Sequence, residues 1–246
     1  MKFLLRQVLE SCIPNDHSRQ VTIEHYLERV LKLQEIDRVY TVLDLGCGNG
    51  RSRNYFQSLN PKIEWYGVDI ESSPEVLSRT ENSERLVTFD GIHIPFADGY
   101  FDVVHSNQVL EHVKHPRELL SEVSRVVKPG GVFIGSTSHL EPFHSYSLWN
   151  YTPYGFSTLM AEAKLKLLEL RPSIDSLTLI IRRGLGAPRL LNTFWKLESP
   201  LNVFITLVGK LLWLSARTIN AMKLMFCGQF IFYATKEAAQ SPNQRT

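Results

Sequence analysis

The chain has 246 residues, of which 43% are hydrophobic, and its 27 basic and 25 acidic residues leave a formal net charge of +2. This length fits one α/β domain with a small appendage. The charge is too small to argue for a nucleic-acid partner, so none is expected.

The three cysteines, Cys12, Cys47 and Cys227, lie far apart and have no metal-ligand spacing. They indicate reduced thiols and a cytoplasmic location, not a disulfide framework. The apolar run within residues 1–6 is too short for a signal peptide.

Residues 1–38 are predicted to form an N-terminal helical cap. Apolar residues recur at helical spacing from Ile23 to Leu33, interleaved with charged side chains. Such a helix either covers a ligand cleft or packs as an ordinary outer helix.

The central motif begins with the apolar run Thr41–Leu45, which predicts a buried strand. Gly46, Gly48 and Gly50 follow, and residues 51–59 have a helical pattern. Because glycine accepts positive φ and has no Cβ, such a loop can lie close to a ligand. A strand, a glycine loop and a helix in this order suit a nucleotide-like ligand at the carboxyl end of a parallel strand.

A dinucleotide-binding oxidoreductase would have its third glycine one residue later, where this chain has Arg51. The carboxylate of Asp44 would also repel a pyrophosphate, whereas it could attract an amine or a sulfonium through water. An NAD-dependent enzyme is therefore a less favoured alternative.

Two further strands are predicted to end in acidic residues. The strand Glu64–Ile70 carries Asp69 near its end, where a carboxylate can accept hydrogen bonds from both hydroxyls of a ribose. Asp90 and Gly91 follow a third strand over residues 85–89. A fourth strand is predicted over residues 101–106, a helix over 116–127 and a fifth strand over 131–136.

The segment 137–156 is rich in histidine and aromatic residues and follows the fifth strand at the same sheet edge. It is either an acceptor pocket or an aromatic loop that packs over the sheet, and its candidate contacts are His139, His144, Tyr146 and Tyr151. The spacing of these histidines fits no usual metal-ligand set, so no metal is expected.

The end of the chain is predicted to contain a strand over 165–171, a helix over 176–182 capped by Asp175, and a final strand over 228–235. Residues 184–226 interrupt this core. Within them one amphipathic helix is predicted, whose apolar stripe consists of Leu201, Phe204, Ile205, Val208, Leu211, Leu212 and Ile219. Its opposite side carries Asn202, Thr206, Lys210, Trp213, Arg217 and Asn220. The region over 199–226 would be a lid, a homodimer surface or a helix resting on a membrane, the first two being favoured.

Four strings resemble those of class I S-adenosylmethionine (SAM)-dependent methyltransferases: VLDLGCGNG at 42–50, IPFADGYFDVV at 94–104, LEH at 110–112 and RVVKPGG at 125–131. The resemblance implies a Rossmann-like, doubly wound α/β fold with a seven-stranded, mostly parallel sheet and an antiparallel last strand. It implies a SAM-binding core over 39–183 and 227–237, with residues 184–226 inserted and residues 238–246 as a disordered tail. It also implies a helix near the N-terminus that covers the cofactor cleft.

The resemblance implies SAM as cofactor and S-adenosylhomocysteine as product, with a small-molecule, sugar or lipid-linked acceptor. A non-catalytic module that binds either molecule is the alternative. His112 is either a base or a buttress of its loop, the second being favoured. The candidate catalytic residues are His112, His144 and Tyr151, and the candidate cofactor-binding residues are Asp44, Gly46, Cys47, Gly48, Gly50, Asp69, Ile70, Asp90, Gly91, Asn107, Gln108 and Val109.

Overall fold

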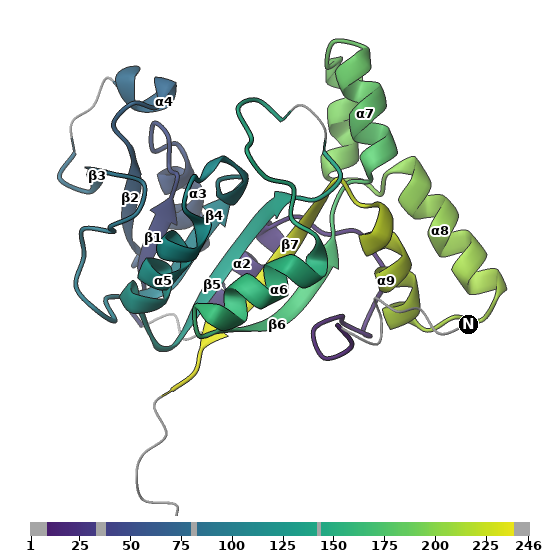
Figure 1. The fold of residues 1–246 in the computed structure, drawn as a ribbon, viewed down its shortest axis with the longest axis horizontal. Coiled ribbons are helices and arrows are strands. Elements are labelled where there is room, and N and C mark those ends of the chain that lie inside the picture. Colours follow the sequence, from purple (N-terminus) through teal and green to yellow (C-terminus); the bar gives the residue numbers. More distant parts are fainter. Residues whose placement is uncertain (1–8, 33–37, 80–82, 142–143, 239–246) are drawn as a thin grey trace, which may run out of the picture.

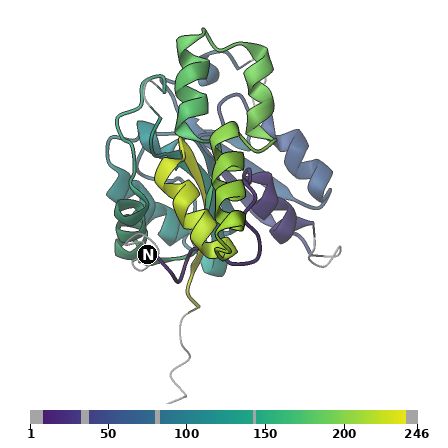
Figure 2. The ribbon, with the colours of Figure 1, turned by 90° about the vertical axis from the view of Figure 1, so that its right-hand side faces the viewer.

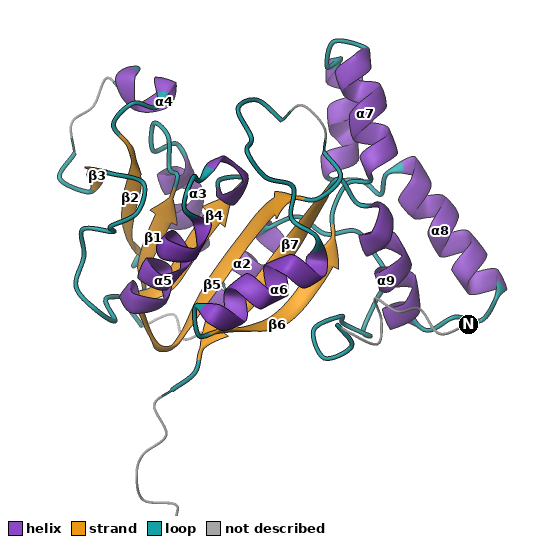
Figure 3. Cartoon of the chain, in the orientation of Figure 1, coloured by secondary structure: helices purple, strands orange, loops and turns teal. Residues whose placement is uncertain are grey.

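A seven-stranded sheet with the order β3-β2-β1-β4-β5-β7-β6 forms the centre of the computed structural model, which describes residues 9–32, 38–79, 83–141 and 144–238 (Figures 1 and 3). Neighbouring strands from β3 to β5 are parallel, and β7 runs antiparallel to both β5 and β6. The predicted fold class is therefore confirmed. The strands are β1 (Thr41–Leu45), β2 (Glu64–Ile70), β3 (Leu86–Phe89), β4 (Phe101–Asn107), β5 (Val127–Ser138), β6 (Leu165–Pro172) and β7 (Gln229–Lys236).

Helices cover both faces of the sheet because successive strand residues point to opposite sides. Val103 and Ile231 join the apolar cluster under α2 (Glu24–Leu31) and α3 (Ser52–Leu59). Their neighbours Val104 and Phe232 join the opposite cluster. That second cluster lies under α5 (Pro116–Val126), α6 (Pro153–Glu162) and α9 (Ala216–Phe226), and Figure 1 shows α5 and α6 in front of the sheet.

The fifth strand is longer than the sequence predicted. The helix α5 ends at Val126, and β5 begins at once with Val127, which pairs with Phe101. The register then shifts between Phe101 and Val103, so residues 128–131 form a bulge within the strand. The prolyl and glycyl residues there end the helix, as expected, but they do not delay the strand.

The described part of the predicted N-terminal cap contains one α-helix, α2. Tyr26, Leu27, Val30 and Leu31 bury its apolar side against the sheet, and Glu24, His25 and Glu28 face a cavity described below. Residues 1–8 and 33–37 of the cap, and residues 239–246 of the expected tail, lie outside the described residues.

The prediction of one continuous amphipathic helix in the insertion is wrong. The helix α7 (Ser176–Gly184) is followed by the 3-10 helix η2 (Arg189–Trp195), and two separate helices, α8 (Pro200–Leu211) and α9, come next. Trp213 adopts a left-handed backbone with φ of 52° at the turn between α8 and α9, and Ser215 caps α9. A Cβ on Gly209 would lie 2.6 Å from Ile219 Cγ1, so the glycine lets α9 pack closely on α8. These helices stand beyond the β6 edge and face the viewer in Figure 2.

The predicted apolar stripe is buried only in part. Ile205 and Ile219 are buried, whereas Phe204 and Leu211 of the same stripe are 61% and 78% exposed. Asn202 and Asn220, predicted on the opposite side, are fully buried, as is Lys223. The buried polar groups bind the N-terminal segment: Asn220 Nδ2 donates to the carbonyl of Pro14, and Lys223 Nζ donates to the carbonyl of Ser18. The sequence pattern gave the helical spacing, but not which side chains would find partners.

No helix within the described ranges has the length and apolar content needed to cross a lipid bilayer.

We expect Lys223→Ala to lower the free energy of unfolding by about 3 kcal/mol, because it leaves Glu198 and the Ser18 carbonyl without a buried cation. Lys210→Ala on the exposed side of α8 is the matched control and should change it by less than about 0.5 kcal/mol. Urea-induced unfolding of both variants measures the difference. If both substitutions lowered the free energy of unfolding by the same small amount, the buried contacts of Lys223 would not contribute to stability as proposed.

Candidate active site

The glycine loop joins β1 to α3 at the carboxyl edge of the sheet. Gly46, Gly48 and Gly50 have φ values of 77°, 53° and 82°, which favour glycine. A Cβ on Gly46 would lie 2.3 Å from Val109 Cγ2, so this position also needs the missing side chain for packing. The loop is thereby held close to the segment that follows β4.

Asp69, near the end of β2, holds the glycine loop through a hydrogen bond to its backbone. The amide of Gly48 donates to Asp69 Oδ2 at 2.7 Å, and the amide of Ile70 donates to Oδ1 at 2.7 Å. Burial raises the pKa of the Asp69 carboxyl above its usual value. Each carboxylate oxygen can accept a further hydrogen bond, and Asp69 lines a cavity.

This smaller cavity has a volume of about 720 Å³ and lies at the ends of β1, β2, β3 and β4. Its apolar lining includes Ile70, Leu77, Phe89, Ile92 and Val109. A volume of this size and a mostly apolar wall with a few polar groups are usual for a small-molecule site. The predicted cofactor-binding residues that line it are Gly46, Asp69, Ile70, Asp90, Gly91 and Val109.

Asp90 organises the turn on the far side of this cavity. Its Oδ1 accepts from the amides of Ile92 and His93, and its Oδ2 lies 2.6 Å from His93 Nδ1. The hydrogen bond with His93 lowers the pKa of Asp90 to about 2. The carboxylate is therefore ionised across the physiological range.

Four other predicted cofactor residues are not among the described residues that line the smaller cavity. Gly48 and Gly50 shape the loop, and burial raises the pKa of the Cys47 thiol to about 12. Asp44 is buried and turned to protein partners: its Oδ1 lies 2.7 Å from His105 Nδ1, and its Oδ2 accepts from Ser52 Oγ. Its carboxylate thus joins β1 to β4 and α3.

A larger cavity of about 1030 Å³ opens on the other side of the strand ends. Asn107 and Gln108 at the end of β4, which the sequence predicted to bind the cofactor, line this larger cavity. Its wall also includes residues of the N-terminal segment 17–25, of the ends of β5 and β7, and of the segment 195–198 at the end of η2. Arg19, Lys196 and Glu198 give this wall a polar character.

Gln108 has a left-handed backbone, with φ of 56°. This conformation is unfavourable for a side chain other than glycine or asparagine and is often found at functional sites. With the oxygen and nitrogen of its side-chain amide exchanged, which matches the donors and acceptors around them, Gln108 Nε2 donates to Glu111 Oε1 at 2.8 Å. The strained residue thus connects the end of β4 with the 3-10 helix η1 (Leu110–His112).

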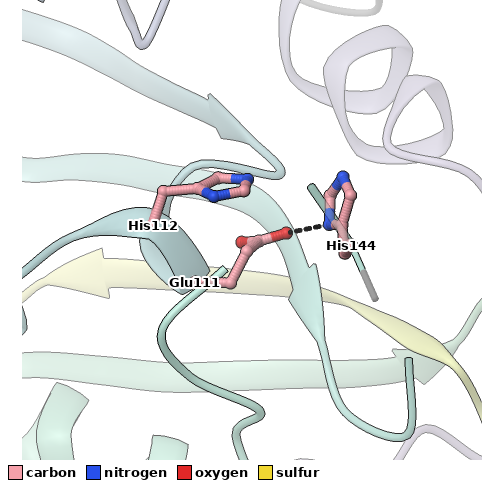
Figure 4. Close-up of side chains that lie close together, drawn as sticks. All are labelled: Glu111, His112 and His144. Atoms are coloured by element: carbon pink, nitrogen blue, oxygen red, sulfur yellow. Dashed lines mark ion pairs between the residues drawn. The ribbon is translucent and has the colours of Figure 1, made fainter. Parts of the chain in front are cut away.

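Glu111, His112 and His144 lie together where the linings of the two cavities come close (Figure 4). His112 lines the smaller cavity and His144 the larger, and their rings lie edge to face with centroids 5.1 Å apart. His144 Nδ1 lies 3.2 Å from Glu111 Oε1, the pair joined by the dashed line in Figure 4.

Glu111 is fully buried, yet its carboxylate is well supplied with partners. Thr137 Oγ1 donates to Oε2 at 3.0 Å, and Ser138 Oγ donates to Oε1 at 3.1 Å. The hydrogen bond with Glu111 raises the pKa of His144 above its usual value. A buried carboxylate that orients an imidazole at a cavity wall is the arrangement of a general base.

One ligand atom each from Glu111, His112 and His144 also lies within 4.8 Å of the others, a grouping that could hold a metal ion. The sequence argued against a metal because the histidine spacing fits no usual set. That argument considered only the histidines, whereas the structure places Glu111 of η1 beside His144.

The other expected acceptor contacts are not among the described residues that line either cavity. Tyr151 donates its hydroxyl to the Leu110 carbonyl at 2.9 Å, and burial raises its pKa. His139 Nδ1 lies 2.9 Å from the Tyr151 carbonyl, and burial lowers the pKa of His139. Tyr146 is 87% exposed. These residues therefore hold the loop in place or face solvent.

Sequence reasoning missed several residues of the site. Glu111 stood in the recognised LEH string, so a signal for it was present. Glu141 and Arg183, which form an ion pair at 2.8 Å beside His144, carried no such signal. Residues 17–25 were expected to be part of a cap, and the structure places them in the wall of the larger cavity.

Residues 43–135 match a family model described as a methyltransferase domain. An uncharacterized methyltransferase of Schizosaccharomyces pombe is 34% identical over 113 residues, which cover 40% of this chain and 40% of that protein. A tRNA (carboxymethyluridine(34)-5-O)-methyltransferase of Arabidopsis thaliana is 28% identical over 124 residues, covering 49% of this chain and 30% of that protein. The chain thus spans less than half the length of these two relatives.

Among solved structures, the [4+2]-cyclase SpnF has a TM-score of 0.57 and 18% identity, and the likeness covers 96% of this chain and 92% of that one. At this identity the likeness shows the fold alone. The matched segment and the methyltransferases among the relatives indicate a methyltransferase domain over residues 43–135, and the doubly wound sheet agrees with it.

Proposed function

We propose that this chain binds SAM in the smaller cavity and catalyses methyl transfer to a hydroxyl group of an acceptor in the larger cavity. One observation carries the proposal: His112 of the smaller cavity and His144 of the larger cavity have ring centroids 5.1 Å apart, and the buried Glu111 pairs with His144. A methyl donor on one side and an acceptor on the other would come together there, which is what transfer between two bound molecules requires.

The residues of the smaller cavity fit the parts of SAM. Asp69 offers carboxylate oxygens to the two ribose hydroxyls, and Asp90 offers an acceptor to the exocyclic amine of adenine. Phe89, Ile92 and Leu77 supply apolar surface for the adenine ring. When bound, SAM supplies a methyl group made electrophilic by its sulfonium.

A hydroxyl acceptor must lose a proton as the new bond forms, and His144 is placed to take it. Its Nδ1 is engaged with Glu111, which leaves Nε2 for the acceptor. Glu111 stabilises the imidazolium that results, since the buried carboxylate lies at hydrogen-bond distance. This arrangement supports a hydroxyl over a carboxylate acceptor, because a carboxylate would need no base.

The lining of the larger cavity supports a polar acceptor such as a small alcohol, a sugar or the head group of a lipid-linked molecule. The relative that acts on tRNA suggests a second acceptor class, but the small net charge of +2 gives no electrostatic support for binding an extended nucleic acid.

We expect Asp69→Ala to raise the dissociation constant for SAM by about 10- to 100-fold, because two charge-assisted hydrogen bonds are lost. Isothermal titration calorimetry measures this change for SAM and S-adenosylhomocysteine. Asp98→Ala, at a side chain that is 82% exposed, is the matched control and should bind like the wild type.

The same titration with NADH separates the proposal from an oxidoreductase. Binding of NADH that SAM does not displace would contradict the assignment of the smaller cavity. Unchanged SAM affinity in Asp69→Ala would contradict the role of this carboxylate.

We expect Glu111→Gln to lower the pKa of His144, because the variant removes the carboxylate that stabilises the protonated ring. In the wild type the ring should lose its proton only above its usual pKa, so the base form grows as the pH rises through that raised value. NMR titration of the imidazole resonances measures both values, with His144→Ala identifying the signal. Glu162→Gln, at an exposed ion pair with Arg117, should leave the titration unchanged.

A transfer assay tests the reaction itself. SAM with a labelled methyl group is incubated with fractions of small molecules, glycolipids and total tRNA, and labelled products are identified by mass spectrometry. We expect label in a hydroxyl-bearing small molecule or glycolipid, and His144→Ala should lose transfer by about 100-fold while it keeps SAM affinity. SAM binding without transfer in any fraction would favour a non-catalytic module, and label in tRNA alone would contradict the proposed acceptor class.

A further inference from the structure

The outer side of α8 and the turn after it carry a continuous row of exposed apolar side chains. Phe204, Leu207 and Leu211 follow one another at helical spacing, and Trp213 at the turn is 95% exposed. We call this row the α8 surface; its members are Val203, Phe204, Leu207, Leu211, Leu212 and Trp213.

The α8 surface lies opposite the buried side of the helix, which is formed by Asn202, Ile205 and Gly209. Asn202 is fully buried and donates to Gln20 Oε1 at 2.7 Å and to the Ser173 carbonyl at 2.9 Å. An amphipathic helix in water normally turns its large apolar side chains inward. In α8 most of them face outward, so water contacts them unless another surface covers them.

The apolar exposure is concentrated in this part of the chain. Among the residues that the structure describes, 22 large hydrophobic side chains are exposed, and 14 of them lie between Leu177 and Phe226. They include Ile180 and Ile181 on α7, and in Figure 1 α7 and α8 both stand at the edge of the molecule beyond β6. Scattered exposed apolar residues are normal, but a gathering of this kind marks an interaction surface.

The charge of the same segment indicates what covers it. Residues 177–226 contain seven basic residues and one acidic residue, whereas the rest of the chain contains 20 basic and 24 acidic residues. Lys210 lies on α8 itself, and Arg189 and Lys196 are exposed nearby in the sequence. The segment is therefore positively charged on a chain that is otherwise slightly negative.

We propose that the α8 surface docks this protein onto an anionic lipid bilayer. The apolar row would enter the boundary between head groups and acyl chains, and the exposed Arg189, Lys196 and Lys210 would face anionic head groups. The other basic residues include Lys223, Arg183 and Arg217, which pair with Glu198, Glu141 and Glu10 within the protein. Tryptophan at the tip suits this boundary because its ring is apolar and its N–H is polar. A second copy fits less well, since a two-fold interface would bring the same positive segments together.

Flotation with lipid vesicles tests the proposal on the full chain. The vesicles contain phosphatidylcholine alone, or two parts phosphatidylcholine to one part phosphatidylglycerol, at about 0.1 M and about 1 M salt. We expect binding to the anionic vesicles at low salt. The double substitution Phe204→Ser and Trp213→Ser should weaken it by at least about tenfold, and Lys210→Glu by about tenfold, with less effect at high salt.

The matched control carries Val39→Ser and Tyr154→Ser, two side chains that are 51% and 60% exposed elsewhere on the protein. It should bind vesicles like the wild type. SAM titration and thermal unfolding without vesicles show that each variant is folded, and they keep this test separate from that of the proposed function.

Vesicle binding that is absent in the wild type, or that is equal in the α8 and control variants, would overturn the proposal. Sedimentation velocity measures whether the protein forms a dimer. A dimer that the α8 substitutions dissociate, without vesicle binding, would assign the surface to a second copy instead.

Discussion

The buried carboxylate of Glu111 is the constraint on which the site depends. A fully buried charge is costly unless hydrogen bonds and opposite charge surround it, and here Thr137, Ser138 and His144 do so. The backbone of the same residue accepts from the amides of Leu148 and Trp149, which holds the loop after β5 against η1. Because one residue fixes both the base and the loop, the wall between the two cavities has a defined shape.

The insertion and the N-terminal segment complete the larger cavity together. Asn202, Asn220 and Lys223 hold residues 14–20, and residues 17–25 form part of the cavity wall. The buried polar residues of α8 and α9 therefore help to build the proposed acceptor site. The same packing leaves Phe204, Leu207 and Leu211 on the outer side of α8, so the shape of the cavity and the proposed membrane surface have one structural cause.

The acidic residues near the smaller cavity have two different roles. The strand ends place Asp69 and Asp90 on one side of the glycine loop, and both carboxylates keep their backbone partners while they face the cavity. Asp44, only two residues before the first glycine, is turned away to His105 and Ser52. Asp44 pairs in register with Gly67, two residues before Asp69, so both carboxylates point to the same face of the sheet and differ in their distance from the strand ends.

The sequence by itself determined the sheet, the glycine loop with Asp69, and the helix after Asp175, because strand and helix periods, glycine conformation and capping act over a few residues. It also pointed to His144 and His112. Only the tertiary structure decided that Glu111 pairs with His144, that Tyr151 binds the Leu110 carbonyl, and that α8 buries Asn202. Those outcomes depend on partners far apart in the chain: Asn202 finds Gln20, 182 residues away, and no local pattern contains that contact.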